Sequence, residues 1–228
     1  MQILGHNVSN FTPLAQTSPS TPCIRRATPV DVPAIVQLQT ICQPHFHLTD
    51  PGAAFLRSFY SFVLHDHRGT LFVSEQDHKL AGFVAGFSDP SQLYERVASQ
   101  KLRIFATAFG CLARHPIQLP KFLGDVYRAS HLKYAPGCCS ETACELVAVA
   151  VQPRLRLEGH GKALILALAE VAKRSKMDQL RVHIDSNDAG MASFYRKLGF
   201  HPFRAVRASD TQWLHEYVLT IYVNGKVT

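Results

Sequence analysis

The residues from Glu145 to Gly161 combine a carboxylate, an apolar run and two closely spaced glycines. The run E-L-V-A-V-A-V predicts a buried strand, and the residues after it predict a glycine-containing turn that opens a helix from Lys162 onward. Such a unit can bind a diphosphate, because glycines allow positive φ and close approach while the first N–H groups of the helix are unpaired. An ordinary strand-to-helix connection would also explain the two glycines taken alone.

These glycines belong to a longer motif, and a second motif follows it. The first, V-x-P-x-x-R-x-x-G-x-G-x-x-L, consists of Val151, Pro153, Arg156, Gly159, Gly161 and Leu164. The second, F-Y-R-K-L-G-F, covers residues 194–200. Both resemble motifs of the GNAT superfamily of acyl-CoA-dependent N-acyltransferases, over a region from about Cys23 to the C-terminus. The resemblance implies an α/β fold of the GNAT type, with a central mixed but mostly antiparallel sheet flanked by helices.

The resemblance also implies acetyl-CoA as co-substrate, without a metal. The residues expected to bind it lie on the strand, in the turn and after the next strand: Val149, Ala150, Val151, Arg156, Leu157, Glu158, Gly159, His160, Gly161, Lys162 and Asn187. Two positions depart from the family pattern. Glu158 stands where a basic residue is common, and Asp188 stands where an asparagine is common, so that Asn187 is displaced by one residue. We expect the charge of Glu158 to repel a diphosphate unless its side chain points to solvent.

Two residues match the positions at which relatives handle protons. Glu145 stands where several GNAT enzymes place a general base that acts directly or through water, and Tyr195 matches their general acid. An amide of the 149–151 segment would stabilise the charge on the carbonyl oxygen. Structural roles remain as alternatives, because Glu145 could pair with Arg181 or Lys79, and Tyr195 could pack in the core.

The histidines do not predict a metal site. His45 and His47, like His65 and His67, have i, i+2 spacing, and no cysteine or carboxylate completes a ligand set. The resemblance places His45 and His47 in the connection between the first two helices, which commonly borders the acceptor pocket. They are therefore weak candidates for substrate contact.

The order of predicted elements agrees with one domain over residues 23–228, after a flexible leader at residues 1–22. The predicted elements before the motif are a strand at Ile24–Ala27, helices at about 31–41 and 56–63, and a hairpin of Leu71–Ser74 and Leu80–Phe87. A helical insertion is expected at about 89–139, between the third and fourth strands. Its basic polar faces indicate either a solvated surface or a lid or dimer element.

The composition limits the class of protein. With 228 residues, 46% of them apolar, the chain can bury a sizeable core without disulfides, and its six cysteines lack metal-ligand spacing. We expect reduced thiols, a cytoplasmic location and no membrane span. A homodimer is an open expectation.

The net charge of +7 bears on the acceptor. It favours an anionic amine, such as an amino sugar, a nucleotide-linked amino sugar or an amino acid derivative, over a polycation. A protein N-terminus or lysine is the alternative acceptor, and a non-catalytic acyl-CoA-binding module is the alternative class. Nucleic-acid binding is disfavoured, because the chain lacks an aromatic-basic recognition motif.

Overall fold

The computed structural model describes residues 22–43, 52–88, 142–207 and 213–221. These ranges contain the strands β1 (Cys23–Arg26), β2 (Gly69–Gln76), β3 (Lys79–Ser88), β4 (Ala143–Val151), β5 (Gln179–Asp185), β6 (His201–Arg207) and β7 (Trp213–Thr220). They also contain the helices α1 (Val32–Cys42), α2 (Ala53–His65), α6 (His160–Arg174) and α7 (Ala189–Lys197), and the short 3-10 helices η1 (Pro29–Asp31) and η3 (Pro153–Leu155). The predicted leader up to residue 21, His45, His47 and the predicted insertion lie outside the described residues.

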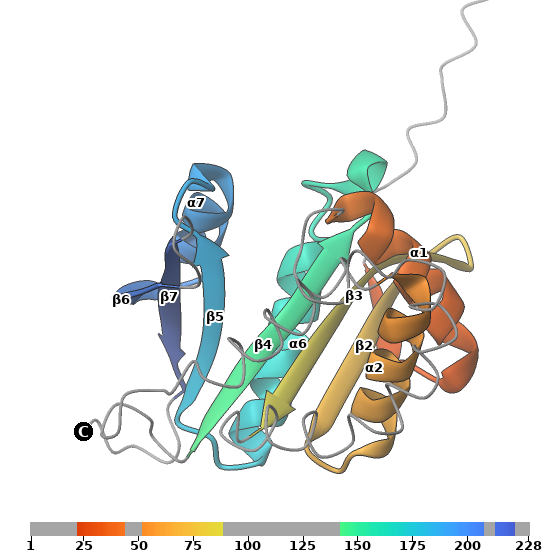
Figure 1. The fold of residues 1–228 in the computed structure, drawn as a ribbon, viewed down its shortest axis with the longest axis horizontal. Helices are drawn as coiled ribbons and strands as arrows, with labels where there is room; N and C mark the ends of the chain where they lie inside the picture. Colours follow the sequence, from red (N-terminus) through yellow and green to blue (C-terminus); the bar gives the residue numbers. More distant parts are fainter. Residues whose placement is uncertain (1–21, 44–51, 89–141, 208–212, 222–228) are drawn as a thin grey trace, which may run out of the picture.

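The described strands form one sheet in the order β1-β2-β3-β4-β5-β7-β6 (Figure 1). Among the described strands, the only parallel pair is β4 with β5, and every other neighbouring pair is antiparallel. The sheet therefore agrees with the mixed, mostly antiparallel sheet that was predicted. The predicted hairpin is β2 and β3, and each predicted early element lies within about three residues of an observed one.

Helices cover the two faces of the sheet. One face packs against α1 and α2, through side chains such as Val73, Phe83 and Phe87. The other packs against α6 and α7, through side chains such as Leu146 and Val182. Helix α6 approaches β3 closely, because a Cβ added at Gly86 would lie 2.5 Å from the Cδ1 atom of Leu168. The small residues of β3 thus leave room for α6 to pack closely.

Strands β4 and β5 pair over only part of their length. Residues Ala143–Leu146 pair with Gln179–Val182, but β4 continues to Val151 and β5 to Asp185. The pairing of β3 with β4 skips Val147, which is an extra residue in β4, and such a β-bulge bends a strand. From this bulge onward the two strands diverge, as Figure 1 shows. We call the region between Val147–Val151 and His183–Asp185 the wedge.

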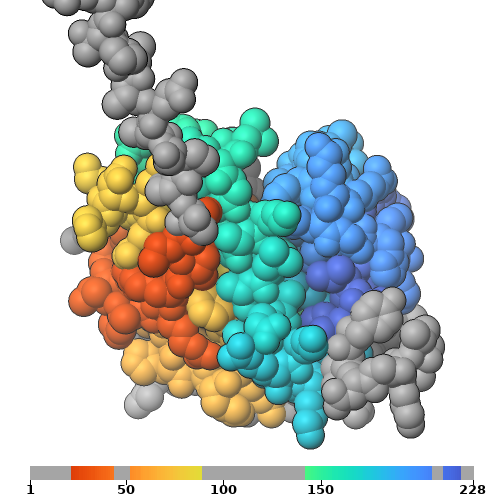
Figure 2. Space-filling model, turned by 180° about the vertical axis from the view of Figure 1, so that it is seen from behind, coloured from red at the N-terminus to blue at the C-terminus, as the bar shows by residue number. Residues whose placement is uncertain are grey.

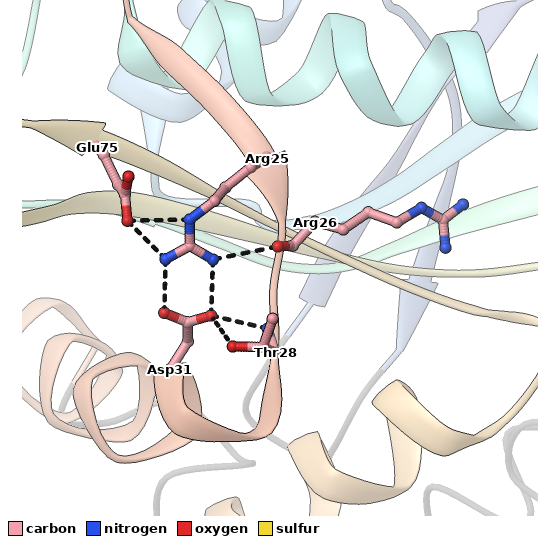
Figure 3. Close-up of polar contacts among 5 residues, drawn as sticks. All are labelled: Arg25, Arg26, Thr28, Asp31 and Glu75. Carbon is pink, nitrogen blue, oxygen red and sulfur yellow. Dashed lines mark hydrogen bonds and ion pairs between the residues drawn. The ribbon is translucent and has the colours of Figure 1, made fainter.

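An arginine on β1 holds the start of α1 against the sheet (Figure 3). The guanidinium of Arg25 donates two hydrogen bonds of 2.8 Å to Asp31 and others to Glu75 on β2. Asp31 also accepts from the backbone N–H of Thr28 at 2.7 Å and from its hydroxyl at 2.8 Å. These bonds fix the chain where it enters α1, whose far end reaches the wedge. No helix among the described residues is long and apolar enough to cross a membrane.

Candidate active site

The turn after β4 differs from the sequence-based prediction in where its helix begins. Helix α6 begins at His160, two residues before the predicted Lys162, because Gly159 has a φ of +92° and its carbonyl accepts the first helical bond, from Ala163 N at 2.9 Å. Leu157 also has a positive φ, of +69°. Gly161 does not have a positive φ. Its lack of a Cβ instead admits the Phe194 ring, which a Cβ would meet at 3.3 Å.

Within the part of the chain that the structure describes, consecutive main-chain amides in this turn have no backbone acceptor. Arg156 donates its N–H to Pro153 O, and the next backbone bond among the described residues is that of Ala163. The N–H groups of residues 157–162 lie between these two bonds, at the positive end of the α6 dipole. Such an arrangement can bind an anion such as a diphosphate. The predicted phosphate-binding turn therefore has the groups that this role requires.

The side chain of His160 is buried and holds the turn against β2. Its Nδ1 atom lies 2.6 Å from the hydroxyl oxygen of Ser74, and its Nε2 atom lies 2.9 Å from Oε1 of Gln76. With 2% of its surface exposed, His160 presents only its backbone to a ligand. The sequence places His160 among the expected binding residues but does not predict this anchoring contact.

The other predicted side chains of the turn face solvent. Arg156, Leu157, Glu158 and Lys162 are exposed, so Arg156 and Lys162 are available to an anion and Glu158 places a negative charge beside them. In Figure 2 the surface of α6 (teal) lies beside the surface of the α7 segment (blue), and a notch separates their upper ends.

The outer part of β4 directs backbone groups toward the wedge. Gln152 N donates to Ala81 O at 2.8 Å. Because hydrogen-bonded and non-hydrogen-bonded pairs alternate in an antiparallel ladder, the N–H and C=O groups of Ala150 also point toward β3. Those of Val149 and Val151 point away from β3. Of the predicted segment, Val149 and Val151 can thus offer an amide to a ligand, and Ala150 cannot. Their carbonyls contact the end of α1, since Gln43 Nε2 donates to Val149 O at 3.3 Å and Cys42 Sγ lies 3.4 Å from Val151 O.

Glu145 lies on β4 just before the wedge, on the sheet face of α1 and α2. Its Oε1 atom is 3.5 Å from Nδ1 of His183, the first residue of β5 beyond the last β4–β5 pair. The side chain of Glu145 is 6% exposed and that of His183 is 19% exposed. Lys79 stands eight residues along β3 from Phe87, the neighbour of Glu145, or about 26 Å away. The predicted alternative of a Glu145–Lys79 pair is therefore wrong.

Further charged side chains lie beside His183, on the same face of the sheet as Glu145. His183 stands opposite Glu216 on β7, which in turn stands opposite Arg204 on β6. Glu216 is fully buried and accepts hydrogen bonds from Arg204 and, at 3.4 Å, from Arg181. We call this set the polar row, and it consists of Glu145, Arg181, His183, Arg204 and Glu216.

The polar row changes the basicity of His183. Burial by itself would lower the pKa of the imidazole, but contact with the Glu145 carboxylate and the charge of Glu216 outweigh burial and the opposing charge of Arg204. The pKa of His183 is raised above its usual value as a result. Protonated His183 is thus stabilised by two carboxylates.

Tyr195 lies on the opposite face of the sheet from Glu145. Its ring packs edge-on against Phe194 and Phe200, in the core that includes Val149 and Ile184 on the two sides of the wedge. Burial raises the pKa of its hydroxyl above the usual value, so Tyr195 stays protonated at neutral pH. Core packing, the structural alternative for Tyr195, is thus observed. A protonated hydroxyl can still donate a hydrogen bond to a thiolate.

The residues after β5 are used for local structure. Asp188 is the N-cap of α7, where its Oδ1 atom accepts from Met191 N at 2.9 Å. Asn187 donates its backbone N–H to Asp185 Oδ1 at 2.9 Å, and its side chain is exposed. The aspartate that replaces the family asparagine therefore has a capping function.

Sequence reasoning missed His183, Arg204, Glu216, Ser74 and Gln43. One signal was present, because β5 reads Q-L-R-V-H-I-D, with a polar residue at every second position of a strand inside the sheet. That alternation predicts one polar face but does not identify its partners. Among the described residues, no group of three or more His, Cys, Asp or Glu side chains could hold a metal ion.

Comparisons with known proteins agree with this geometry. The profile of the Acetyltransferase (GNAT) family matches residues 32–200. The chain belongs to this family. The match covers both sequence motifs and the wedge, and it makes the protein an acyltransferase. The sequence has no significant match among curated proteins.

Solved structures of low sequence identity share the fold. The ribosomal-protein-S18-alanine N-acetyltransferase from Escherichia coli is 14% identical, with a TM-score of 0.57 over 91% of this chain and 99% of the other. Ard1 from Thermoplasma volcanium is 13% identical, with a TM-score of 0.57 over 88% and 98%. The protein yncA from Salmonella typhimurium, solved with its cofactor acetyl-CoA, is 16% identical, with a TM-score of 0.58 over 92% and 99%.

The family uses acetyl-CoA, and the residues present suit that molecule. The amides of residues 157–162 match a diphosphate, and the amides of Val149 and Val151 match the polar groups of an extended arm. Exposed Arg156 and Lys162 supply positive charge at the turn. When bound, acetyl-CoA supplies the activated acetyl group as a thioester.

Proposed function

We propose that the protein transfers the acetyl group of acetyl-CoA to a primary amine of a small molecule. The observation that carries the proposal is the wedge, which has at its outer end amides without a backbone acceptor among the described residues, and a carboxylate–imidazole pair where it begins. In this proposal the turn binds the diphosphate, and Val149 and Val151 align the arm that carries the acetyl group.

The amine must lose a proton before it can react. An alkyl ammonium with a pKa of about 10.4 is neutral in about one molecule in 2,500 at pH 7, which corresponds to about 4.6 kcal/mol. Glu145, acting directly or through an intervening group or water, accepts this proton in our proposal. Tyr195, on the other face of the sheet, donates a hydrogen bond or proton to the departing thiolate.

The proposed acceptor class is an anionic amine, such as an amino sugar, a nucleotide-linked amino sugar or an amino acid derivative. The support is the net charge of +7, which attracts anions and repels polycations. A protein N-terminus or lysine is the second candidate. The proposal includes a cytoplasmic location, because the free thiols of Cys23, Cys42 and Cys144 suit a reducing compartment.

Two measurements test the proposal. Calorimetric titration with acetyl-CoA should show binding, and thiol release should occur with at least one member of a panel of amino sugars, nucleotide-linked amino sugars, amino acid derivatives and peptides. Binding without thiol release from any amine would favour the non-catalytic module. No binding of acetyl-CoA would overturn the proposal altogether.

Two variants test the roles of the protonating groups. Glu145→Gln should slow transfer at pH 7 by about 10²-fold or more, because the carboxylate on which removal of the proton depends is lost. Tyr195→Phe keeps the ring packing and removes the hydroxyl, so a loss of turnover with unchanged acetyl-CoA affinity would support its role as an acid. Unchanged turnover across pH would exclude that role.

A further inference from the structure

His183 lies where the two sides of the wedge separate. The last β4–β5 pair is Leu146 with Val182, so His183 is the first β5 residue beyond it. On β4 the next residue is Val147, the bulge. A group that reacts where the wedge begins therefore meets the backbone of the bulge on one side and His183 on the other.

The orientation of the imidazole separates the tasks of its two nitrogens. Nδ1 is the atom that faces Glu145, at 3.5 Å, so a hydrogen on Nδ1 is stabilised by the carboxylate and the basic lone pair resides on Nε2. The side chain of His183 is 19% exposed, about three times the 6% of Glu145. The imidazole is thus the member of the pair that a solute reaches more easily.

The charges around His183 favour its protonated form. Among the described residues, four strands carry ionisable groups on the sheet face of His183. These groups are Glu145 on β4, Arg181 and Asp185 on β5, Glu216 on β7 and Arg204 on β6. Arg181 and Arg204 both contact Glu216, whereas His183 contacts Glu145. A proton arriving on His183 is therefore balanced by a nearby carboxylate, which agrees with the raised pKa of the imidazole.

We propose that His183, oriented by Glu145, is the group that takes the proton from the acceptor amine. This inference rests on the proposed function and specifies its base. Nε2 of His183 removes one proton from the ammonium group, and the nitrogen lone pair forms the C–N bond as the C–S bond breaks. The second nitrogen-bound proton passes to the thiolate, directly or by way of Tyr195, and the imidazolium returns its proton to water. Glu145 is then a positioning residue.

The first experiment tests the contact between His183 and Glu145 without measuring turnover. In a proton NMR titration of the full chain, the imidazole signal that is absent from His183→Gln identifies His183. We expect its pKa to lie above 6.5 in the wild type and to fall in Glu145→Gln, because the stabilising carboxylate is removed. An identical pKa in the two proteins would overturn the pairing.

The second experiment tests the role of His183 in catalysis by measuring how turnover depends on pH. The acid limb of kcat/KM against pH should follow the NMR pKa of His183 and move to lower pH in Glu145→Gln. His183→Gln should lose this limb and about 10²-fold or more in kcat, with little change in the KM for acetyl-CoA. His201→Gln, a change of the same type on exposed β6, should match the wild type. If His183→Gln is too unstable to assay, the pH shift in Glu145→Gln decides the question.

The outcomes separate this inference from the proposed function. Suppose that the wild type turns over and that His183→Gln has the same rate and pH profile. Glu145 would then act without the imidazole, and only this inference would fall. Absence of thiol release by the wild type with every amine would overturn both, even if the NMR titration showed that the two side chains interact.

Discussion

The hydroxyl oxygen of Ser74 lies 2.6 Å from Nδ1 of His160 and joins β2 to the first residue of α6 across 86 residues of sequence. A neutral imidazole satisfies both of its contacts, because Nε2–H donates to Gln76 Oε1 while Nδ1 accepts from Ser74. The proposed diphosphate-binding amides begin three residues before this anchor. The position of the turn therefore depends on a buried side chain that does not face the ligand.

Replacing His160 with leucine should destabilise the fold by about 1–3 kcal/mol, because it leaves the buried Ser74 hydroxyl and the Gln76 carbonyl without this partner. Urea denaturation measures the loss, and acetyl-CoA affinity should fall with it. Ser74→Ala in the His160→Leu background should cost less than it does alone, because its partner is already absent. Full additivity of the two changes would contradict the contact.

Substitutions of Gly159 should follow the cost of a positive φ. At φ +92°, with nothing within 4 Å of an added Cβ, the effect is conformational and not steric. Gly159→Ala should cost about 1–2 kcal/mol in unfolding free energy, and Gly159→Val more, whereas Gly159→Asn should be the mildest because asparagine tolerates this region. Thermal unfolding and acetyl-CoA titration of the three variants test this order. Equal effects of asparagine and valine would refute it.

Asp31→Asn should destabilise the protein by about 1–2 kcal/mol at pH 7, a value reduced for the partial exposure of its partner Arg25. Hydrogen bonds from Arg25, followed by those from Thr28, hold the pKa of Asp31 far below its usual range despite partial burial. A carboxyl with a lowered pKa in the folded state stabilises the fold above its unfolded pKa of about 3.9, and this stability is lost as the pH falls below that value.

Urea denaturation of wild type and Asp31→Asn at several pH values tests the sign. The difference between them should be full at pH 7 and shrink below about pH 4. Glu170→Gln is a control, because Glu170 pairs with Arg174 on the solvent-facing side of α6 and should contribute about 0.5 kcal/mol or less. A difference for Asp31→Asn that grows on acidification would contradict the assignment.

Glu158→Lys should tighten acetyl-CoA binding about 3- to 10-fold, since it replaces a charge that repels a diphosphate with one that attracts it. Calorimetry at low and high salt should show the gain shrinking with ionic strength. Glu170→Lys makes the same charge change about 15 Å further along α6 than the turn, and it should have little effect. Equal affinity of Glu158→Lys and wild type would exclude an electrostatic role for Glu158.

Local patterns explain how much of the fold was predictable. The hairpin β2–β3 and the unit β4–turn–α6 follow from strand-length apolar runs, short polar connections and glycines, which act over a few residues of sequence. The start of α6 was predicted two residues late, because one glycine at positive φ and another inside the first helical turn look alike in sequence.

The candidate site divides in the same way. Glu145, Tyr195 and the residues of the turn were identified by the sequence motifs alone, because these positions are defined by spacing along one strand, one turn and one helix. The contacts of Glu145 with His183, of His160 with Ser74 and of Gln43 with Val149 were decided by the tertiary structure. Each contact joins residues that are 38 or more positions apart in the sequence. Such contacts are determined by strand register, by the bulge at Val147 and by helix packing, and a short stretch of chain encodes none of these three features.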